Sequence, residues 1–331
     1  MSRRIMVMFL LVSLMVGISF SVFAQSDLRD LQNNVKGLSE DLAKALPFNS
    51  ALGLNWSDAY IGKVTEGHFG AGVSAGITTM DISSINSVVN NLGANISLDW
   101  SKMPIPAYAI EGRIGGFFLP FDIGLKFGVL PSINLLDINL DYLQVGGDLR
   151  FAILDGKSSL LLPNVSLGVG VNYLKGGIGT SAATSQDISF GINNRIHLGD
   201  ANVNLEWNTL ALDLKAQVSK TFFIITPYLG LGGSYAFSGA GYSVNAEITR
   251  NNVRISQADI DEINRYLRDW GLGEVDINAD GISSIQKSND FTVRAFGGLS
   301  LNLAVFRLDL TGLYSFLDGN FGGSVGLRFQ L

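Results

Sequence analysis

Apolar and polar residues alternate along most of this chain with a period of two. In Val165–Tyr173 every odd-numbered residue is Val, Leu or Tyr, and the residues between them are Ser, Gly or Asn. Successive side chains of a strand point to opposite faces, so this pattern predicts strands with one apolar and one polar face. We count about ten such stretches, at residues 69–77, 108–115, 122–129, 143–151, 164–173, 209–218, 228–235, 291–299, 307–316 and 324–331.

The composition indicates where these strands lie. The mean hydropathy is +0.28 and only 16% of residues are charged, yet no apolar run long enough for a membrane helix follows the first 24 residues. A transmembrane barrel resolves this conflict, because lipid-facing and lumen-facing residues alternate along its strands. The predicted fold is all-β: a closed antiparallel barrel of about ten strands, with eight, twelve or fourteen as alternatives.

The N-terminus predicts export. Arg3 and Arg4 precede an apolar run, and Val22 and Ala24 put small residues at the two positions that a signal peptidase reads. Residues 1–24 are therefore predicted to be a signal peptide, cleaved between Ala24 and Gln25. A retained membrane anchor is the alternative.

Residues 25–62 are predicted to form an amphipathic helix followed by a plug-like segment. One apolar stripe at helical spacing comprises Leu28, Leu31, Val35, Leu38 and Leu42. Pro47 is expected to end the helix. The irregular stretch that follows either enters the lumen or, with the helix, caps the periplasmic mouth of the barrel.

Residues 63–331 are predicted to form the barrel. Long connections at 78–104, 175–207 and 239–290 are assigned to the extracellular side, and short turns to the periplasm. An even strand number then places both termini in the periplasm. Gly199-Asp200 suggests a further hairpin, which either extends the sheet outside the membrane or raises the strand number to twelve. Short loop helices are expected at 81–93 and 256–271.

The last strand carries a recognisable pattern. Ser324, Gly326, Phe329 and Leu331 stand at the polar, glycine and two apolar positions of "SVGLRFQL". This pattern resembles the C-terminal β-signal of bacterial outer-membrane β-barrels, although that signal more often ends in Phe or Trp. The resemblance implies the outer membrane of a diderm bacterium, recognition by the barrel-assembly machinery, and a last strand that pairs with the first.

The polar phase of the strands predicts a charged lumen. Several acids and bases stand two residues apart on one strand face, which suggests ion pairs along the strands. The predicted lumen charges are Glu111, Arg113, Lys126, Asp148, Arg150, Asp213, Lys215, Arg294, Arg307, Asp309 and Arg328. They either fill and stiffen the barrel or line a constriction that favours anions.

The predicted function is a porin-like channel for small solutes, partly occluded by its N-terminal segment. One alternative is a non-conducting structural or surface-binding barrel that acts through its loops. A second rests on the N-terminal element, which resembles the plug of fatty-acid transporters of the FadL type and implies a carrier of hydrophobic molecules.

Other classes of function are not predicted. His68 and His197 are the two histidines and stand in no catalytic motif, so no enzyme is expected. The chain has no cysteine and a net charge of −6, so thiolate metal sites are excluded and no nucleic-acid partner is expected. No cofactor is predicted. The predicted partners are outer-membrane lipid and a small or hydrophobic solute.

Overall fold

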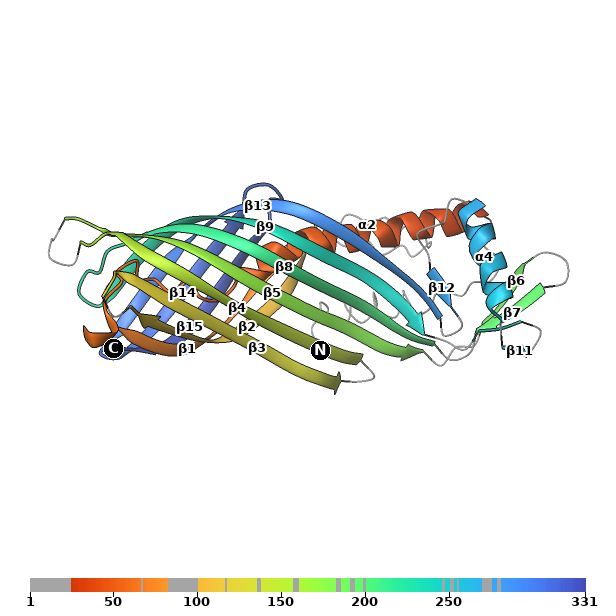
Figure 1. Cartoon of the computed structure of the whole chain (residues 1–331), viewed down its shortest axis with the longest axis horizontal. Coiled ribbons are helices and arrows are strands. Elements are labelled where there is room, and N and C mark those ends of the chain that lie inside the picture. Colours follow the sequence, from red (N-terminus) through yellow and green to blue (C-terminus); the bar gives the residue numbers. More distant parts are fainter. Residues whose placement is uncertain are drawn as a thin grey trace.

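The fold is a closed antiparallel barrel with a long helix that reaches into it (Figure 1). The computed structural model describes residues 25–66, 68–82, 101–116, 118–135, 138–156, 161–182, 186–190, 194–198, 201–245, 248–250, 253–254, 256–269, 276–278 and 281–331. The predicted signal peptide, its cleavage site and the loop helix expected at 81–93 therefore lie wholly or mainly outside the described residues. Among the described helices, none is long and apolar enough to span a membrane.

Ten strands form the barrel wall, as predicted. They are β1 (Phe69–Asp81), β2 (Lys102–Gly115), β3 (Phe121–Leu135), β4 (Ile138–Leu154), β5 (Asn164–Ala182), β8 (Ala201–Ser219), β9 (Ile225–Asn245), β13 (Gly281–Leu303), β14 (Phe306–Ser315) and β15 (Phe321–Gln330). Each pairs with its two neighbours, and β13 pairs with β9 across the long connection.

The barrel closes between its first and last strands. Register runs from Gly70↔Gln330 to Thr78↔Gly322. The strand that resembles the assembly signal is thus the partner of β1, and closure leaves no open edge at this position for hydrocarbon to solvate.

The alternating pattern decides which face of each strand meets lipid. On β5, Val169 and Val171 are exposed on the outside, whereas Asn172 and Ser166 are buried inside. Burial of the polar phase and exposure of the apolar phase is the reverse of a water-soluble sheet, and it is what a membrane barrel requires.

Two ends of the barrel differ in their connections. At the short-turn end, the connections span 116–120, 155–163, 220–224 and 304–305. At the long-loop end lie the long connections 82–101, 183–200 and 246–280, together with the short ones 136–137 and 316–320. The strands extend several residues into the predicted loops, because paired backbone is stable in water as well as in lipid.

Further elements lie beyond the long-loop end (Figure 1). A small sheet has the order β11-β10-β7-β6, from β6 (Gln186–Phe190), β7 (Asn194–Leu198), β10 (Ile248–Arg250) and β11 (Val253–Arg254). The hairpin expected about Gly199-Asp200 differs from the described pairing: β6 pairs with β7, whereas β8 pairs with β5 and β9 from Ala201 onward, so the twelve-strand alternative is wrong. β12 (Asp276–Asn278) pairs with β13. α4 (Gln257–Asp269) begins after Ser256, whose N–H donates to Asp259 Oδ2 at 3.0 Å, while the Asp259 N–H donates to Ser256 Oγ at 3.3 Å, as the capping pattern predicted.

The N-terminal helix α2 (Gln25–Ser50) enters the barrel from the long-loop end (Figure 1). It does not end at Pro47. The proline lies in the last turn, and Ser50 Oγ closes that turn by donating to the Pro47 carbonyl at 2.8 Å. After a short 3-10 helix, η1 (Val64–Glu66), the chain enters β1 at the short-turn end.

The ends of the described chain lie at opposite ends of the barrel. Gln25 lies toward the long loops, and Leu331 lies at the short-turn end, where its N–H donates to the Phe69 carbonyl at 3.0 Å. The placement of both termini in the periplasm stays a prediction, since the structure does not orient the barrel in the membrane. An even strand number places the start of the first strand and the end of the last strand at the same end of the barrel. Before the first strand, however, α2 and the plug run through the lumen from the long-loop end.

Close strand contacts make one glycine indispensable. A Cβ at Gly298 would lie 1.8 Å from the Leu310 carbonyl oxygen, whereas one at Gly112 would meet its nearest atom at 3.8 Å. We expect Gly298→Ala to destabilise the refolded barrel by about 1–3 kcal/mol, since the strands must move apart. Gly112→Ala is the control, and urea unfolding in detergent is the measurement. Equal unfolding midpoints for the two variants would contradict the register of β13 and β14.

Candidate functional site: a lumen filled by the chain's own N-terminal segment

The plug segment, Leu38–Gly62, runs through the lumen from the long-loop end to the short-turn end. The part of the plug nearer the long-loop end, called the upper part here, is the inner half of α2, where Leu38, Leu42 and Leu46 are buried. These side chains form one apolar cluster with residues of the barrel wall, namely Met80, Ile82, Ile105, Leu174 and Ala240. Apolar burial thus holds the helix in the upper lumen.

Below the helix, side chains of the wall bind the irregular backbone of the plug. Lys126 Nζ donates to the carbonyls of Ser50 and Leu52 at 2.7 and 2.6 Å. Gln144 Nε2 donates to the same two carbonyls at 3.0 and 3.1 Å. Buried carbonyls without helical partners need such donors. Lys126 and Gln144 therefore supply the hydrogen bonds that the plug backbone lacks where the helix ends.

The same arrangement continues toward the short-turn end. Lys215 Nζ donates to the Leu54 carbonyl at 3.0 Å. Gln217 Nε2 donates to the carbonyls of Trp56 and Ser57 at 2.7 and 2.9 Å. Lys215 and Gln217, both on β8, therefore bind three carbonyls of the plug between Leu54 and Ser57.

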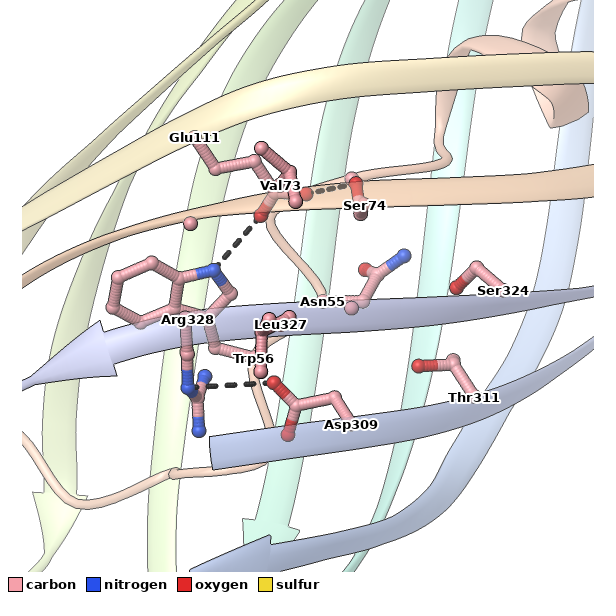
Figure 2. A pocket seen from close by; sticks show the side chains of 13 residues that line it. Asn55, Trp56, Val73, Ser74, Glu111, Asp309, Thr311, Ser324, Leu327 and Arg328 are labelled. Atoms are coloured by element: carbon pink, nitrogen blue, oxygen red, sulfur yellow. Dashed lines mark hydrogen bonds and ion pairs between the residues drawn. The ribbon is translucent and has the colours of Figure 1, made fainter. Parts of the chain in front are cut away.

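Glu111 binds donors of the plug from the opposite side (Figure 2). Its Oε2 accepts from the Leu54 N–H and from Trp56 Nε1, both at 2.8 Å. Its Oε1 accepts from the Ser74 hydroxyl. The carboxylate thus fixes both the backbone and the indole of the plug to β2.

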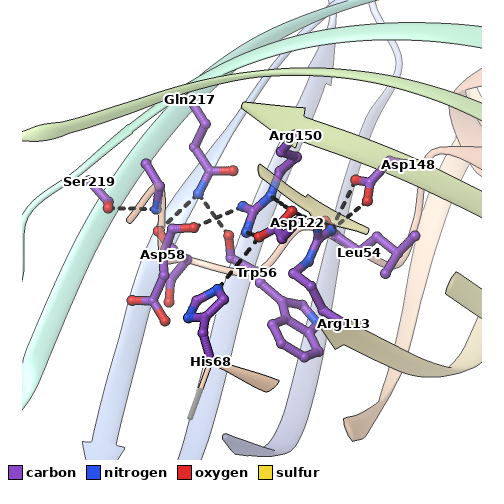
Figure 3. Close-up of polar contacts among 12 residues, drawn as sticks. Leu54, Trp56, Asp58, His68, Arg113, Asp122, Asp148, Arg150, Gln217 and Ser219 are labelled. Atoms are coloured by element: carbon purple, nitrogen blue, oxygen red, sulfur yellow. Dashed lines mark hydrogen bonds and ion pairs between the residues drawn. The ribbon is translucent and has the colours of Figure 1, made fainter. Parts of the chain in front are cut away.

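Asp122 is the centre of the charged cluster at the short-turn end (Figure 3). It lies 2.5 Å from Arg113 and 2.6 Å from Arg150, and its side chain is fully buried. His68 Nε2 lies 3.6 Å away. Arg150 also donates to the Asp58 carbonyl of the plug at 2.8 Å, so the cluster extends from the wall to the segment inside it.

Other ion pairs extend this cluster around the wall. Arg113 lies 2.8 Å from Asp148, which also pairs with Lys215. Farther along the wall, Arg294 lies 2.8 Å from Asp213. Buried charges are tolerated where each has a partner and hydrogen bonds, and these have both.

Asp58 is the acid that the plug contributes. It lies 3.3 Å from Arg328 and 3.8 Å from Arg307, and Arg328 lies 3.3 Å from Asp309. Burial would raise the pKa of the Asp58 carboxyl, but the guanidiniums of Arg328 and Arg307 outweigh it and hold the pKa below its usual range. Asp58 is therefore ionised at neutral pH.

Two cavities lie beside the plug in the described part of the chain. A cavity of about 20 Å³ lies between Trp56, Glu111 and Arg328 (Figure 2), which is room for about one water molecule. A larger cavity of about 360 Å³ lies at the short-turn mouth, beside Tyr60 and Lys220. At the level of Trp56, the plug and the wall thus leave room for little more than one water molecule.

The structure places all the predicted lumen charges inside the barrel, with Arg307 half-buried. Their pairing differs from the prediction. The ion pairs join different strands instead of residues two apart on one strand: Arg113 pairs with Asp122 on the neighbouring strand, and Asp148 pairs with Lys215 two strands away. Residues i and i+2 are about 7 Å apart, whereas directly opposed residues on paired strands are about 5 Å apart.

Four residues of this site were missed from the sequence: Asp122, Gln144, Gln217 and Asp58. Asp122 has the same phase as Lys126, so the alternation already placed it in the lumen. Gln144 and Gln217 also lie on the lumen-facing side of their strands, β4 and β8, but they carry no charge and so did not stand out. Asp58 lies on irregular backbone, where no periodic signal exists.

A closed ten-strand wall with a lipid-facing exterior and a plug in its lumen defines a plugged outer-membrane β-barrel. A family profile matches residues 57–331, and the chain belongs to the Lsa36-like family. The match spans the barrel and the lower end of the plug. No curated protein matches the chain.

Solved structures similar to this chain include other membrane barrels, all at very low identity. The translocator domain of the autotransporter NalP from Neisseria meningitidis is 10% identical, with a TM-score of 0.36, over 88% of this chain and 96% of that chain. A Pseudomonas aeruginosa FadL homologue is 8% identical, with a TM-score of 0.27, over 80% and 90%.

The comparison corrects one prediction. The outer membrane protease OmpT from Escherichia coli is 10% identical, with a TM-score of 0.38, over 80% of this chain and 97% of that chain. A protease is therefore among the barrels that the chain resembles, and the prediction of no enzyme does not stand. The barrel fold by itself leaves enzymatic activity undecided.

Proposed function

We propose that the protein is an outer-membrane barrel that is closed at rest and acts through the elements at its long-loop end. The binding of the plug backbone by Lys126, Gln144, Lys215 and Gln217 supports this proposal most strongly. These side chains bind the chain's own carbonyls and so are not free to line a water-filled pore. Ten strands also make a narrow tube compared with the 16 or more of open porins.

The long-loop end carries the exposed structure that such a function needs. The small sheet, α4 and the outer part of α2 all lie there (Figure 1). Loops on a rigid scaffold are the usual carriers of binding residues. This supports a surface-binding or structural role, with the barrel as its membrane anchor.

An orientation test follows from the absence of cysteine in the natural chain. With short turns in the periplasm, we expect a membrane-impermeant maleimide to label Ala258→Cys on α4 in intact cells. Leu161→Cys, exposed at the short-turn end, is the matched control and should react only after the outer membrane is permeabilised. Labelling of position 161 but not 258 in intact cells would overturn the proposal.

A gated channel is the second candidate. Gly70, Gly72, Gly76 and Gly326 lie on β1 and β15 with no side chain to fill the lumen. At Gly70 a Cβ would lie 3.0 Å from the Trp56 ring, so the plug takes up this space. Removal of the plug would leave an open tube, and the conductance measurement that closes the Discussion tests this.

A further inference from the structure

Two neighbouring hairpins at the short-turn end have apolar tips. The β8–β9 turn, Phe222–Ile225, lies beside the β13–β14 turn, Leu303–Phe306, and the Asn302 N–H donates to the Ile224 carbonyl at 2.7 Å. We call these two turns the apolar tip. Its large apolar side chains are all exposed, namely Phe222, Phe223, Ile224, Ile225, Leu303 and Phe306. Turns of membrane barrels ordinarily lie outside the apolar band, so this surface indicates a contact with something other than water.

Both turns carry an apolar residue where the backbone favours glycine. Phe223 and Ala304 have φ angles of 53° and 56°, and each is the first of the two residues between the paired ends of its turn. Two-residue turns with a positive φ at this position usually have glycine there. The Phe223 side chain is 100% exposed, so no contact within the described protein offsets the strain of its backbone. This favours a compensating contact outside the chain.

The apolar tip continues the lipid-facing surface of the barrel without a polar break. On β9, β13 and β14, the outward positions next to the tip are all apolar, namely Pro227, Leu229, Leu299, Leu301, Leu308 and Leu310. Lys220 lies beside the tip at the end of β8, and its Nζ donates to the Gly156 and Leu162 carbonyls at 3.0 and 2.8 Å. The tip and the lipid-facing strands therefore form one continuous apolar surface.

The height of this surface fits a tip that reaches the edge of the bilayer. Toward the long loops, Tyr235 and Phe237 form an exposed aromatic pair of the kind that marks a membrane interface. Ile225 lies twelve residues from Phe237 on β9, which is about 31 Å of height at about 3.4 Å per residue and a tilt of about 40°. An apolar band of about 25 Å that begins at Phe237 ends about 6 Å before Ile225. The interfacial layer of a bilayer is about 5–7 Å thick on each side, so the tip reaches this layer.

We propose that the apolar tip is a membrane anchor, which inserts Phe223 and its neighbours into the interfacial layer of the lipid leaflet at the short-turn end. Burial of the exposed ring in lipid would offset the strain of the turn. The anchor would hold the barrel at a fixed depth in the bilayer. The proposal goes beyond the surface-acting role, and it requires neither an open nor a closed lumen.

Lipid is the occupant that the continuity of the surface favours. Interfaces between proteins usually have an apolar core and a polar rim. A protein bound at the apolar tip would find no such rim on the side of Leu229 and Leu301, where the apolar surface runs on into the lipid-facing strands. The β4–β5 connection, which carries Leu161, extends farther at this end and is not part of the tip (Figure 1).

The first test separates lipid contact from strain of the turn. Asparagine tolerates a positive φ better than phenylalanine, so strain alone predicts that Phe223→Asn raises the urea midpoint for unfolding. In phosphatidylcholine vesicles we expect the reverse, a lower midpoint for Phe223→Asn and a midpoint near the natural one for Phe223→Leu. Val253→Asn is the matched control, because Val253 is exposed on β11 beyond the long-loop end, and it should leave the midpoint unchanged. An equal or higher midpoint for Phe223→Asn would overturn the anchor.

The second test measures where the tip lies. Phe223→Cys, Leu212→Cys and Lys63→Cys each carry a bimane probe, attached before refolding into phosphatidylcholine vesicles. Leu212 is exposed on the lipid-facing side of β8, and Lys63 is exposed at the short-turn end. Doxyl-labelled phosphatidylcholine quenches probes in lipid, and iodide quenches probes in water. Heat-modifiable migration confirms that each labelled barrel is folded.

We expect the doxyl lipid to quench the probe at position 223 at least half as strongly as that at 212, and iodide to quench it less than half as strongly as that at 63. Iodide quenching at 223 equal to that at 63, without quenching by the lipid, would overturn the anchor and leave the tip as a surface for a protein partner. Because both tests report depth in the bilayer, their failure is distinct from failure of the orientation test or of the conductance measurement.

Discussion

Replacement of Asp122 by Ala is expected to cost the folded barrel about 3–5 kcal/mol. Asp122 is the shared partner of Arg113 and Arg150, and its removal leaves two buried guanidiniums with less compensation. Breaking a buried ion pair on one side is costly for this reason, whereas exposed pairs contribute little. Urea unfolding of the detergent-refolded protein measures the difference.

Two variants make this prediction specific. Asp122→Asn keeps the shape of the side chain and should lose part of the same stability, because it lacks the charge. Asp261→Ala, on the exposed face of α4, should unfold like the natural protein. An Asp122→Ala barrel as stable as the Asp261→Ala barrel would show that the cluster does not hold the wall together.

Replacement of Leu46 by Asp is expected to displace the plug while the barrel remains folded. Leu46 is fully buried in the apolar cluster of the upper lumen. A carboxylate there has no partner in the cluster, so burial would cost several kcal/mol and expulsion of α2 relieves it. We expect increased protease cleavage between residues 38 and 62, with heat-modifiable migration retained.

Lys44→Asp is the matched control for this prediction. Lys44 is exposed on the same helix, within one turn of Leu46. The same charge at this position should leave the plug as resistant to protease as in the natural protein. Equal cleavage of the two variants would mean that apolar burial of α2 does not hold the plug in place.

The sequence predicts the wall of this molecule well. Runs such as Val165–Tyr173 show both the strands and their faces, because lipid outside and a polar lumen inside impose a strict period of two. The same phase places the lumen charges. Closure of the barrel by pairing of Gly70–Thr78 with the last strand also follows from the sequence, since a barrel in lipid cannot leave a strand edge unpaired.

The plug and the ion pairs depend on information that no local pattern carries. The apolar stripe predicts a helix but not its direction through the lumen, which is set by contacts such as Lys126 with the Ser50 carbonyl. Pairing partners such as Asp122 and Arg150 depend on register, which alternation alone leaves open.

The central claim is that the N-terminal segment closes the lumen, and planar-bilayer conductance tests it most directly. The measurement compares refolded residues 25–331 with residues 63–331, which lack the helix and plug. We expect no conductance steps from the longer chain and regular steps from the shorter one. Steps of the same size from both chains would contradict the account, because the segment would then leave the lumen open.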